Sequence, residues 1–136
     1  MIVVAVPTII ARRPPASKAV ALIERGLPWA NVEALADALD VTLDRLAALL
    51  DIPPATFYRR KKARRLARRE SDRLMRFARL WWLARSVFEN EDGARSWLTA
   101  PQFALRGAVP LEYAGTETGA REVEDLLRRI EYGVLA

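Results

Sequence analysis

Hydrophobic residues recur at helical spacing along most of the chain from residue 16 onward. In one segment, Leu43, Leu46, Ala47 and Leu50 follow the i, i+3, i+4, i+7 spacing that lines up one apolar helix face. The same spacing recurs in several later segments, with polar residues between the apolar ones. Beyond the N-terminal residues, the alternation typical of a half-buried strand is absent. The sequence therefore predicts an all-α fold.

Turn and capping residues divide the chain into separate helices. Ser17 is expected to cap a first helix that ends at Gly26, a position suited to left-handed backbone. Pro28 is expected to begin a second helix, and Thr42 to cap a third. Pro53-Pro54 ends the third helix and is tolerated in the first turn of the next, which continues into a basic segment. Further helices are predicted over residues 72–88, 90–98, 110–113 and 117–130.

The N-terminal residues have a different character. Residues 1–10 are mostly apolar, and two arginines and two prolines follow, as in a linker. The segment lacks the positive residues that precede the apolar core of a signal peptide, and Pro7 interrupts it. No stretch approaches the roughly 20 apolar residues that span a bilayer. We expect a short β-prone or disordered leader, or alternatively a strand exchanged between two subunits. The expected organisation is a leader and linker over 1–15, a helix-turn-helix domain over 16–69 and a second helical domain over 70–136, in a cytoplasmic protein with no membrane partner.

The absence of two residue types narrows the possible chemistry. The 136 residues include no cysteine and no histidine, which excludes disulfides, thiol nucleophiles, imidazole catalysis and Cys/His metal sites. Carboxylate pairs such as Glu122 with Asp125, or Glu89 with Glu91, remain as candidates for an enzyme. These pairs lie on charged helix faces beside arginines, where solvated salt bridges are the better explanation. We therefore expect no catalytic residues, no metal, no cofactor and no enzymatic activity.

Positive charge is concentrated in one short segment. The chain carries 22 Lys and Arg against 17 Asp and Glu, and eight of the 22 fall within residues 59–69 without an acidic residue between them. Arginine, which dominates there, suits recognition of phosphate oxygens. We interpret the segment as a nucleic-acid contact, the alternative being a solvated, partly frayed helix. If six of these cations neutralise phosphates, log K falls against log salt with a slope of about −5.

Residues 42–59 have the spacing of a helix-turn-helix pair. Ala47 allows the two helices to approach, while Ile52 in the turn and Phe57 on the second helix close a small core. The second helix then presents its polar side to a DNA groove. Such proteins usually bind two half-sites through a two-fold axis, so an even-numbered oligomer, such as a homodimer, is expected. The predicted DNA-binding residues are Thr56, Tyr58, Arg59, Arg60, Lys61, Lys62, Arg64 and Arg65.

The second half of the chain carries an ordered series of motifs. Residues 71–79 follow the pattern SDRLxRxAR, Trp97 and Leu98 precede Pro101 in a WLxxP segment, and residues 119–133 follow GAxxVExLLxRIExG. In this order, the motifs resemble the Xre/MbcA/ParS antitoxins of bacterial toxin–antitoxin operons, most closely those paired with RES-domain toxins. The resemblance extends from about residue 16 to the C-terminus.

The resemblance implies a non-enzymatic antitoxin with two binding surfaces. The helix-turn-helix would bind the operon's own promoter as an autorepressor, and the C-terminal domain would bind the cognate RES-domain toxin, an NAD-degrading enzyme in this family. The terminal helix and tail are expected to occlude the toxin's active site. Carried onto this chain, the toxin-binding residues are Arg128, Arg129, Ile130, Glu131, Tyr132, Gly133 and Val134. The alternative is a stand-alone helix-turn-helix regulator without a toxin partner.

Two physical points qualify this resemblance. Pro53-Pro54-Ala55 replaces the polar cap and basic residues that open the family's recognition helix, so side-chain contacts to bases from that turn are lost. Gly133 stands where a helix C-cap falls and lets the last residues leave the helix axis, with Tyr132 as an amphipathic anchor. The competing interpretation is a terminal helix that docks Leu126, Leu127 and Ile130 into its own core. The tryptophans that we expect in the core or a subunit contact, rather than around a ligand, are Trp81, Trp82 and Trp97.

Overall fold

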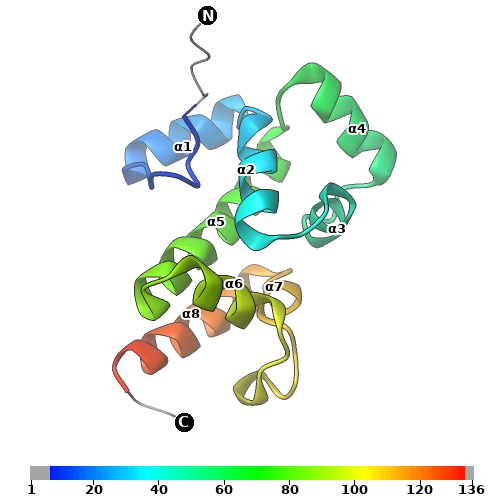
Figure 1. Cartoon of the computed structure of the whole chain (residues 1–136). Coiled ribbons are helices and arrows are strands. Elements are labelled where there is room, and N and C mark those ends of the chain that lie inside the picture. Colours follow the sequence, from blue (N-terminus) through cyan, green and yellow to red (C-terminus); the bar gives the residue numbers. More distant parts are fainter. Residues whose placement is uncertain (1–6, 134–136) are drawn as a thin grey trace, which may run out of the picture.

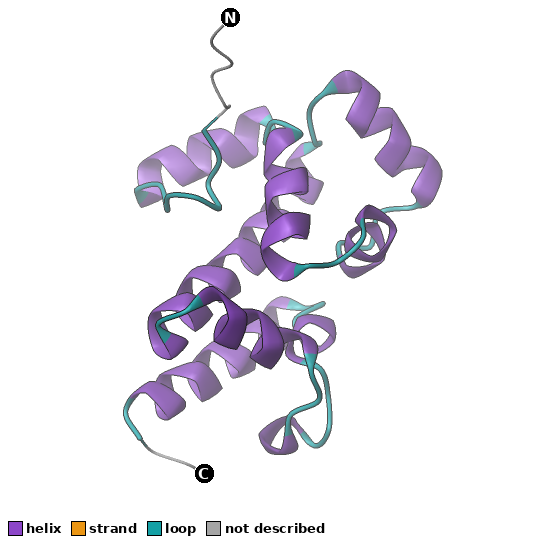
Figure 2. Ribbon diagram, viewed as in Figure 1, coloured by secondary structure: helices purple, strands orange, loops and turns teal. Residues whose placement is uncertain are grey.

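The chain folds into helices joined by short loops (Figures 1 and 2). The computed structural model describes residues 7–133, and within that range no β-strand is present. The helices are α1 (Ala16–Arg25), α2 (Ala30–Leu39), α3 (Leu43–Leu49), α4 (Pro54–Ala63), α5 (Arg68–Phe88), α6 (Glu91–Thr99), the 3₁₀ helix η1 (Phe103–Leu105), α7 (Pro110–Tyr113) and α8 (Glu117–Glu131). The predicted all-α fold is confirmed.

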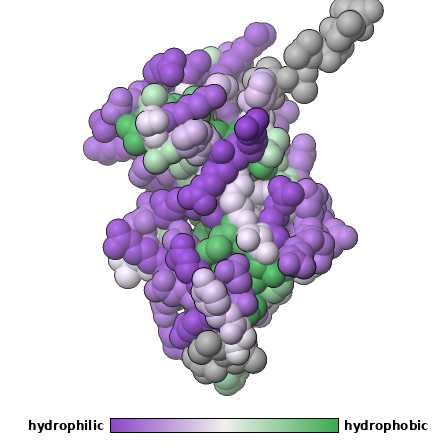
Figure 3. All heavy atoms as spheres, turned by 90° about the vertical axis from the view of Figure 1, so that its left-hand side faces the viewer, coloured by the Kyte–Doolittle hydropathy of each residue, from purple (hydrophilic) through white to green (hydrophobic). Residues whose placement is uncertain are grey.

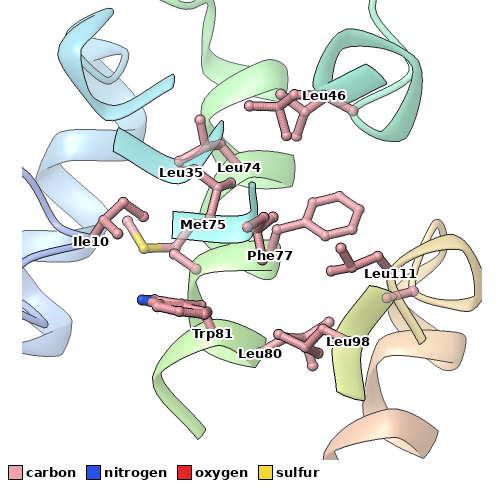
Figure 4. Close-up of a cluster of buried hydrophobic side chains, with 14 of the residues drawn as sticks. Ile10, Leu35, Leu46, Leu74, Met75, Phe77, Leu80, Trp81, Leu98 and Leu111 are labelled. Carbon is pink, nitrogen blue, oxygen red and sulfur yellow. The ribbon is translucent and has the colours of Figure 1, made fainter. Parts of the chain in front are cut away.

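The long helix α5 is the centre of the molecule. Its upper part packs against α1 and α2, and its lower part packs against α6 and α8 (Figure 1). Phe77, Leu80 and Trp81 of α5 are fully buried. The face of the molecule shown in Figure 3 is mostly hydrophilic. Figure 4 shows side chains from α2, α3, α5, α6 and α7 in one continuous apolar core that extends through both halves. The burial predicted for Trp81 is confirmed, while Trp82 and Trp97 are half-buried at the edge of this core.

Polar contacts also tie the two halves together. The Arg95 guanidinium on α6 donates to the Ala38 carbonyl on α2, with 2.8 Å between the two atoms. Arg45 on α3 forms an ion pair with Glu112 on α7. The halves therefore share both a core and surface contacts. The predicted division between residues 69 and 70 falls in the first turn of α5 and stays a prediction.

The N-terminal residues described by the structure are folded onto this body. Ile9 and Ile10 are buried in the core. The Ile9 amide donates to the side-chain oxygen of Asn31, and the Trp82 indole donates to the Ile9 carbonyl, both at 2.9 Å. The expected disordered or β-prone leader is therefore wrong for Ile9 and Ile10, which lie in a turn and pack into the core. Residues 1–6 lie outside the described range.

The starts of α1, α2 and α5 differ from the sequence prediction, and a long-range backbone contact explains that of α2. Residues 27–29 lie against residues 64–66, with the Leu66 amide donating to the Leu27 carbonyl at 2.9 Å and the Trp29 amide to the Arg64 carbonyl at 3.0 Å. This pairing holds Pro28 outside the helix, so α2 begins at Ala30. The first helix begins at Ala16 with Pro15 as its N-cap, and Ser17 does not cap it.

The predicted end of α1 at Gly26 is confirmed, and packing explains the residue. Gly26 has a φ of 87°, a backbone conformation that side chains rarely adopt. A Cβ there would stand 2.2 Å from the Leu66 carbonyl oxygen. Glycine therefore permits both the turn and the close approach of the segment that leads into α5. None of the helices in residues 7–133 combines the length and apolar character needed to cross a bilayer.

Candidate nucleic-acid and partner-binding surfaces

The predicted helix-turn-helix core is present in α3 and α4. Thr42 caps α3, with its hydroxyl oxygen accepting from the Arg45 amide at 3.0 Å. Ala47, Ile52 and Phe57 are all buried, as the spacing predicted. The Phe57 ring meets the Trp29 ring edge-on, with 4.8 Å between their centroids. This packing sets the position of α4, so its outer side chains stand on a rigid support.

The outer face of α4 is basic and aromatic. Tyr58 is 58% exposed, and the Lys62 ammonium lies 4.8 Å from the centre of its ring. The Arg59 guanidinium donates to the Thr56 hydroxyl at 3.2 Å. Helix α4 lies at the end of the molecule opposite the C-terminal part (Figure 1). The predicted DNA-binding residues with exposed side chains are Tyr58, Arg59, Lys61, Lys62, Arg64 and Arg65, while Thr56 is half-buried.

The basic segment 59–69 is not one continuous helix. Helix α4 ends at Ala63, its C-cap Arg64 has a left-handed backbone with a φ of 62°, and the next helix begins at Arg68. Between them Leu66 is 3% exposed and anchors the loop in the core. The eight cations therefore point in several directions rather than along a single helix face.

Two of the predicted DNA-binding arginines make contacts inside the protein. The Arg60 Nε lies 2.8 Å from a carboxylate oxygen of the buried Glu70. The Arg65 guanidinium donates to the carbonyls of Gly26 and Arg25. These roles could not be predicted from the sequence, because a run of like charges gives no sign of which member bonds to other groups of the same chain. Glu70 directly follows the run and was the one available signal.

An ion-pair network joins α5 to the terminal helix. Arg79 on α5 contacts Glu117 at 2.9 Å and Glu124 at 3.2 Å, and Arg76 contacts Glu117 at 3.1 Å. Burial alone would raise the pKa of Glu117, but the hydrogen bonds and charges of Arg79 and Arg76 outweigh it and lower that pKa. Arg76 and Arg79 of the 71–79 motif therefore position α8. Sequence analysis treated them only as a family marker.

The terminal helix has one inward and one outward face. Val123, Leu126 and Leu127 are buried, as the competing interpretation expected, and Ile130 packs half-buried beside them. The Tyr132 side chain is 75% exposed. The predicted turn at Gly133 is confirmed by its φ of 71°. The packing of the inward face that the competing interpretation expected is therefore present, and contact of the outward face with a toxin stays a prediction.

The charged residues of the predicted toxin-binding set differ in their surroundings. Arg128 is exposed and lies within 4.0 Å of Glu124 and Asp125, while Glu131 is exposed. The Nε of Arg129 is buried and has no hydrogen-bond partner within the described residues. Val134 lies outside the described range.

Three of the four candidate carboxylates lie beside arginines, and they are Asp125, Glu91 and Glu122. Glu122 accepts a hydrogen bond from the Tyr113 hydroxyl and lies 3.6 Å from Arg106, and this hydrogen bond raises the pKa of Tyr113. Glu91 lies 4.0 Å from Arg85. The predicted salt bridges are therefore present for Glu122, Asp125 and Glu91.

Comparison with known proteins assigns both halves of the chain. Residues 18–79 match the antitoxin Xre-like helix-turn-helix domain, and residues 83–133 match the antitoxin Xre/MbcA/ParS C-terminal toxin-binding domain. An antitoxin Xre of Yersinia enterocolitica is 33% identical over 90% of this chain and 95% of its own length. An antitoxin Xre of Photorhabdus laumondii is 27% identical over 85% of this chain and 80% of its length. One of Pseudomonas putida is 36% identical over 47% of this chain and 40% of its length.

The chain belongs to the Xre family of antitoxins.

The family resemblance inferred from the three motifs is therefore confirmed. In this Xre-family antitoxin, α1 to α4 and the first half of α5 form the helix-turn-helix match, and the end of α5 with α6 to α8 forms the toxin-binding match. The basic face of α4 and the exposed end of α8 thus belong to different domains. The individual DNA-contacting and toxin-contacting residues stay predictions.

Proposed function

We propose that this Xre-family antitoxin neutralises a cognate RES-domain, NAD-degrading toxin by occluding its active site with the C-terminal helix and tail. We further propose that it binds its own promoter as an autorepressor, in an even-numbered oligomer. One observation carries the proposal: a single folded body bears a helix-turn-helix with an exposed basic face and, at the opposite end, a toxin-binding domain with an exposed helix end.

The DNA contact is assigned to the outer face of α4. The proposed contacts are Thr56, Tyr58, Arg59, Lys61, Lys62 and Arg64. Exposed cations interact with phosphates at little desolvation cost, and they fix the register of a helix on the duplex. Arg60 and Arg65 hold the scaffold of this surface instead, because their guanidinium groups already contact Glu70 and backbone carbonyls. Prolines 53 and 54 leave the first turn without a side-chain cap, so phosphate contacts dominate over base contacts.

Salt dependence tests this assignment. Four exposed cations on phosphates correspond to a slope of about −3.6 in log K against log salt for each bound chain. Replacing Lys61 and Lys62 with alanine is expected to reduce that slope by about 1.8. Fluorescence anisotropy on promoter duplex across a salt series measures both values. Lys18→Ala on the exposed side of α1 is the matched control and should leave the slope unchanged. An equal slope in the double variant and the wild type would contradict the assignment.

The toxin contact is assigned to the outward face and end of α8. Its inward face is held by the core and by the network of Arg76 and Arg79, so the exposed end is presented in a defined direction. An exposed aromatic such as Tyr132 is a typical interface anchor. Gly133, just after the helix, has a left-handed backbone, which is typical of a helix C-terminus and supports a tail that enters a partner's cleft.

Removal of the tail tests this mechanism. A chain truncated after Glu131 retains the buried residues of α8, so it is expected to keep its melting temperature within about 2 °C. It should nevertheless lose rescue of cells that express the neighbouring RES-domain gene. Tyr58→Ala, at the opposite end of the molecule, is the matched control and should still rescue. Full rescue by the truncated chain would refute occlusion by the tail. Absence of any partner in a pull-down, with promoter binding intact, would instead favour a stand-alone regulator.

A further inference from the structure

The toxin-binding domain exposes an aromatic side chain far from the end of its terminal helix in sequence. Among the described residues, the large hydrophobic side chains that are exposed belong to Val20, Tyr58, Phe103 and Tyr132. Phe103, at the start of η1, is 100% exposed. Tyr58 belongs to the basic face of α4 and Tyr132 to the end of α8. The functions proposed above leave Phe103 unexplained, although it lies within the toxin-binding match.

The loop that carries Phe103 is held in one conformation by its own backbone. The Gln102 amide donates to the Ala108 carbonyl at 3.0 Å, and the Gly107 amide donates back to the Gln102 carbonyl at 2.9 Å. The Gln102 side chain donates to the Trp97 carbonyl at 2.9 Å. Leu105 is 2% exposed and anchors the loop in the core. The exposure of Phe103 is therefore a property of an ordered loop.

Side chains hold the second half of the same loop. The Arg106 guanidinium donates to the Tyr113 hydroxyl at 2.7 Å and lies 5.7 Å from the centre of that ring. The Tyr113 hydroxyl donates in turn to Glu122 on α8. The loop is thus attached to the terminal helix. Because little conformational freedom remains to be lost on binding, an aromatic side chain in this setting is a favourable anchor for a partner.

The position of the η1 loop near the toxin-binding end of the molecule favours the toxin as its partner. In Figure 1 the η1 loop and the C-terminal end of α8 lie at the same end of the molecule, opposite α4. One phenylalanine buries about 150–250 Å², far below the roughly 1,200–2,000 Å² of a specific interface. Phe103 must therefore belong to a larger contact surface. The terminal helix, which lies at the same end of the molecule and in the same toxin-binding match, provides such a surface for the toxin.

We propose that Phe103 inserts into an apolar pocket on the surface of the toxin, as a second anchor separate from the tail that enters the active site. This inference rests on the proposed function. In the resulting division of roles, the tail inhibits the toxin, and Phe103 prolongs the life of the complex. Interface substitutions act mostly on the dissociation rate, so loss of the ring should accelerate dissociation without changing inhibition at saturating antitoxin.

The test measures binding of the full chain to the RES-domain protein encoded beside it. Phe103→Ala is expected to raise the dissociation constant of the complex by about 10- to 100-fold, mainly through faster dissociation. Phe103→Trp, which keeps a large aromatic ring, should restore affinity to within about fivefold of wild type. Val20→Ala, at an exposed position on α1, is the matched control and should bind as wild type. Since Phe103 has no packing to lose, melting temperatures should agree among all these variants.

Each outcome has a defined meaning. Wild-type affinity in Phe103→Ala would overturn this inference and leave the proposed function standing. No binding by the wild-type chain would overturn the proposed function and this inference together. If light scattering shows that Phe103→Ala separates an antitoxin dimer while toxin affinity stays unchanged, Phe103 contacts a second copy and the inference is wrong. If the toxin stays active at a saturating concentration of the Phe103→Ala variant, then Phe103 is needed for inhibition itself and the proposed separation of its role from that of the tail is wrong.

Discussion

Replacement of Gly119 with alanine is expected to lower the free energy of unfolding by about 2–4 kcal/mol. Gly119 lies in the first turn of α8, where alanine normally favours a helix by about 1 kcal/mol over glycine. Here the added Cβ would stand 1.9 Å from the carbonyl oxygen of Tyr113, the last residue of α7. That atom belongs to the backbone, so α7 and α8 must separate to admit a methyl group. At this position the usual preference of a helix for alanine over glycine is therefore reversed.

Gly115 offers a matched control four residues earlier. A Cβ there would lie 3.4 Å from the Glu112 carbonyl oxygen, which is an ordinary contact. Gly115→Ala is therefore expected to change stability by no more than about 0.5 kcal/mol. Chemical denaturation followed by circular dichroism compares the two variants in the same protein. Equal stability of Gly119→Ala and wild type would show that α7 and α8 do not approach as the structure has them.

The pairing of α7 and α8 also explains the family motif that begins at Gly119. Sequence analysis used this glycine only as one letter of a pattern. The structure gives it a physical cause, namely the contact between two helices separated by three residues. The same holds for Arg76 and Arg79, whose ion pairs with Glu117 and Glu124 join the 71–79 motif to the terminal helix. The first and last of the three motifs that identify the family thus describe one packed unit.

Periodicity predicted the helices well where one face of a helix is buried and the apolar spacing within that helix marks the face. Leu46 and Leu50 of the helix-turn-helix, and Val123 and Leu127 of α8, are buried as their spacing predicted. The predictions were wrong where distant segments decide the local structure. Residues 27–29 pair with residues 64–66, and Ile9 packs near Trp82. Neither contact leaves a periodic signal, so the start of α2 and the folding of residues 7–15 could not be predicted.

For the candidate sites too, composition predicted the general character of a surface but not the contacts of its individual side chains. The count of cations in residues 59–69 predicted a basic surface, and α4 presents one. Composition does not distinguish an exposed Lys62 from an Arg60 that contacts a buried carboxylate. Exposure of Phe103 was equally inaccessible, because an aromatic residue in sequence is usually counted toward the core. The distinction requires the packing around each side chain.

Replacement of Glu70 with alanine is expected to cost about 2–3 kcal/mol of stability. One carboxylate oxygen of Glu70 accepts from the Arg60 guanidinium and from the Ala67 amide, each at 2.8 Å. The first contact joins α5 to α4, and the second caps α5 three residues before Glu70. This cap is why α5 begins at Arg68 rather than near residue 72, where periodicity placed it. Alanine removes both contacts and leaves two donors unsatisfied, one of them charged.

Comparison of Arg60 with Lys62 separates the structural cations from the DNA-binding ones. Arg60→Ala is expected to lower stability by about 1–2 kcal/mol and to leave the salt slope of promoter binding unchanged. Lys62→Ala is expected to do the opposite, with unchanged stability and a slope smaller by about 0.9. Asp72→Ala, an exposed position in the second turn of α5, controls for charge changes near Glu70 and should stay within about 0.5 kcal/mol of wild type. A double-mutant cycle of Arg60 and Glu70 should give a coupling energy of at least about 0.5 kcal/mol, because the two side chains contact each other directly. A coupling energy near zero, with a reduced salt slope in Arg60→Ala, would instead place Arg60 on the DNA.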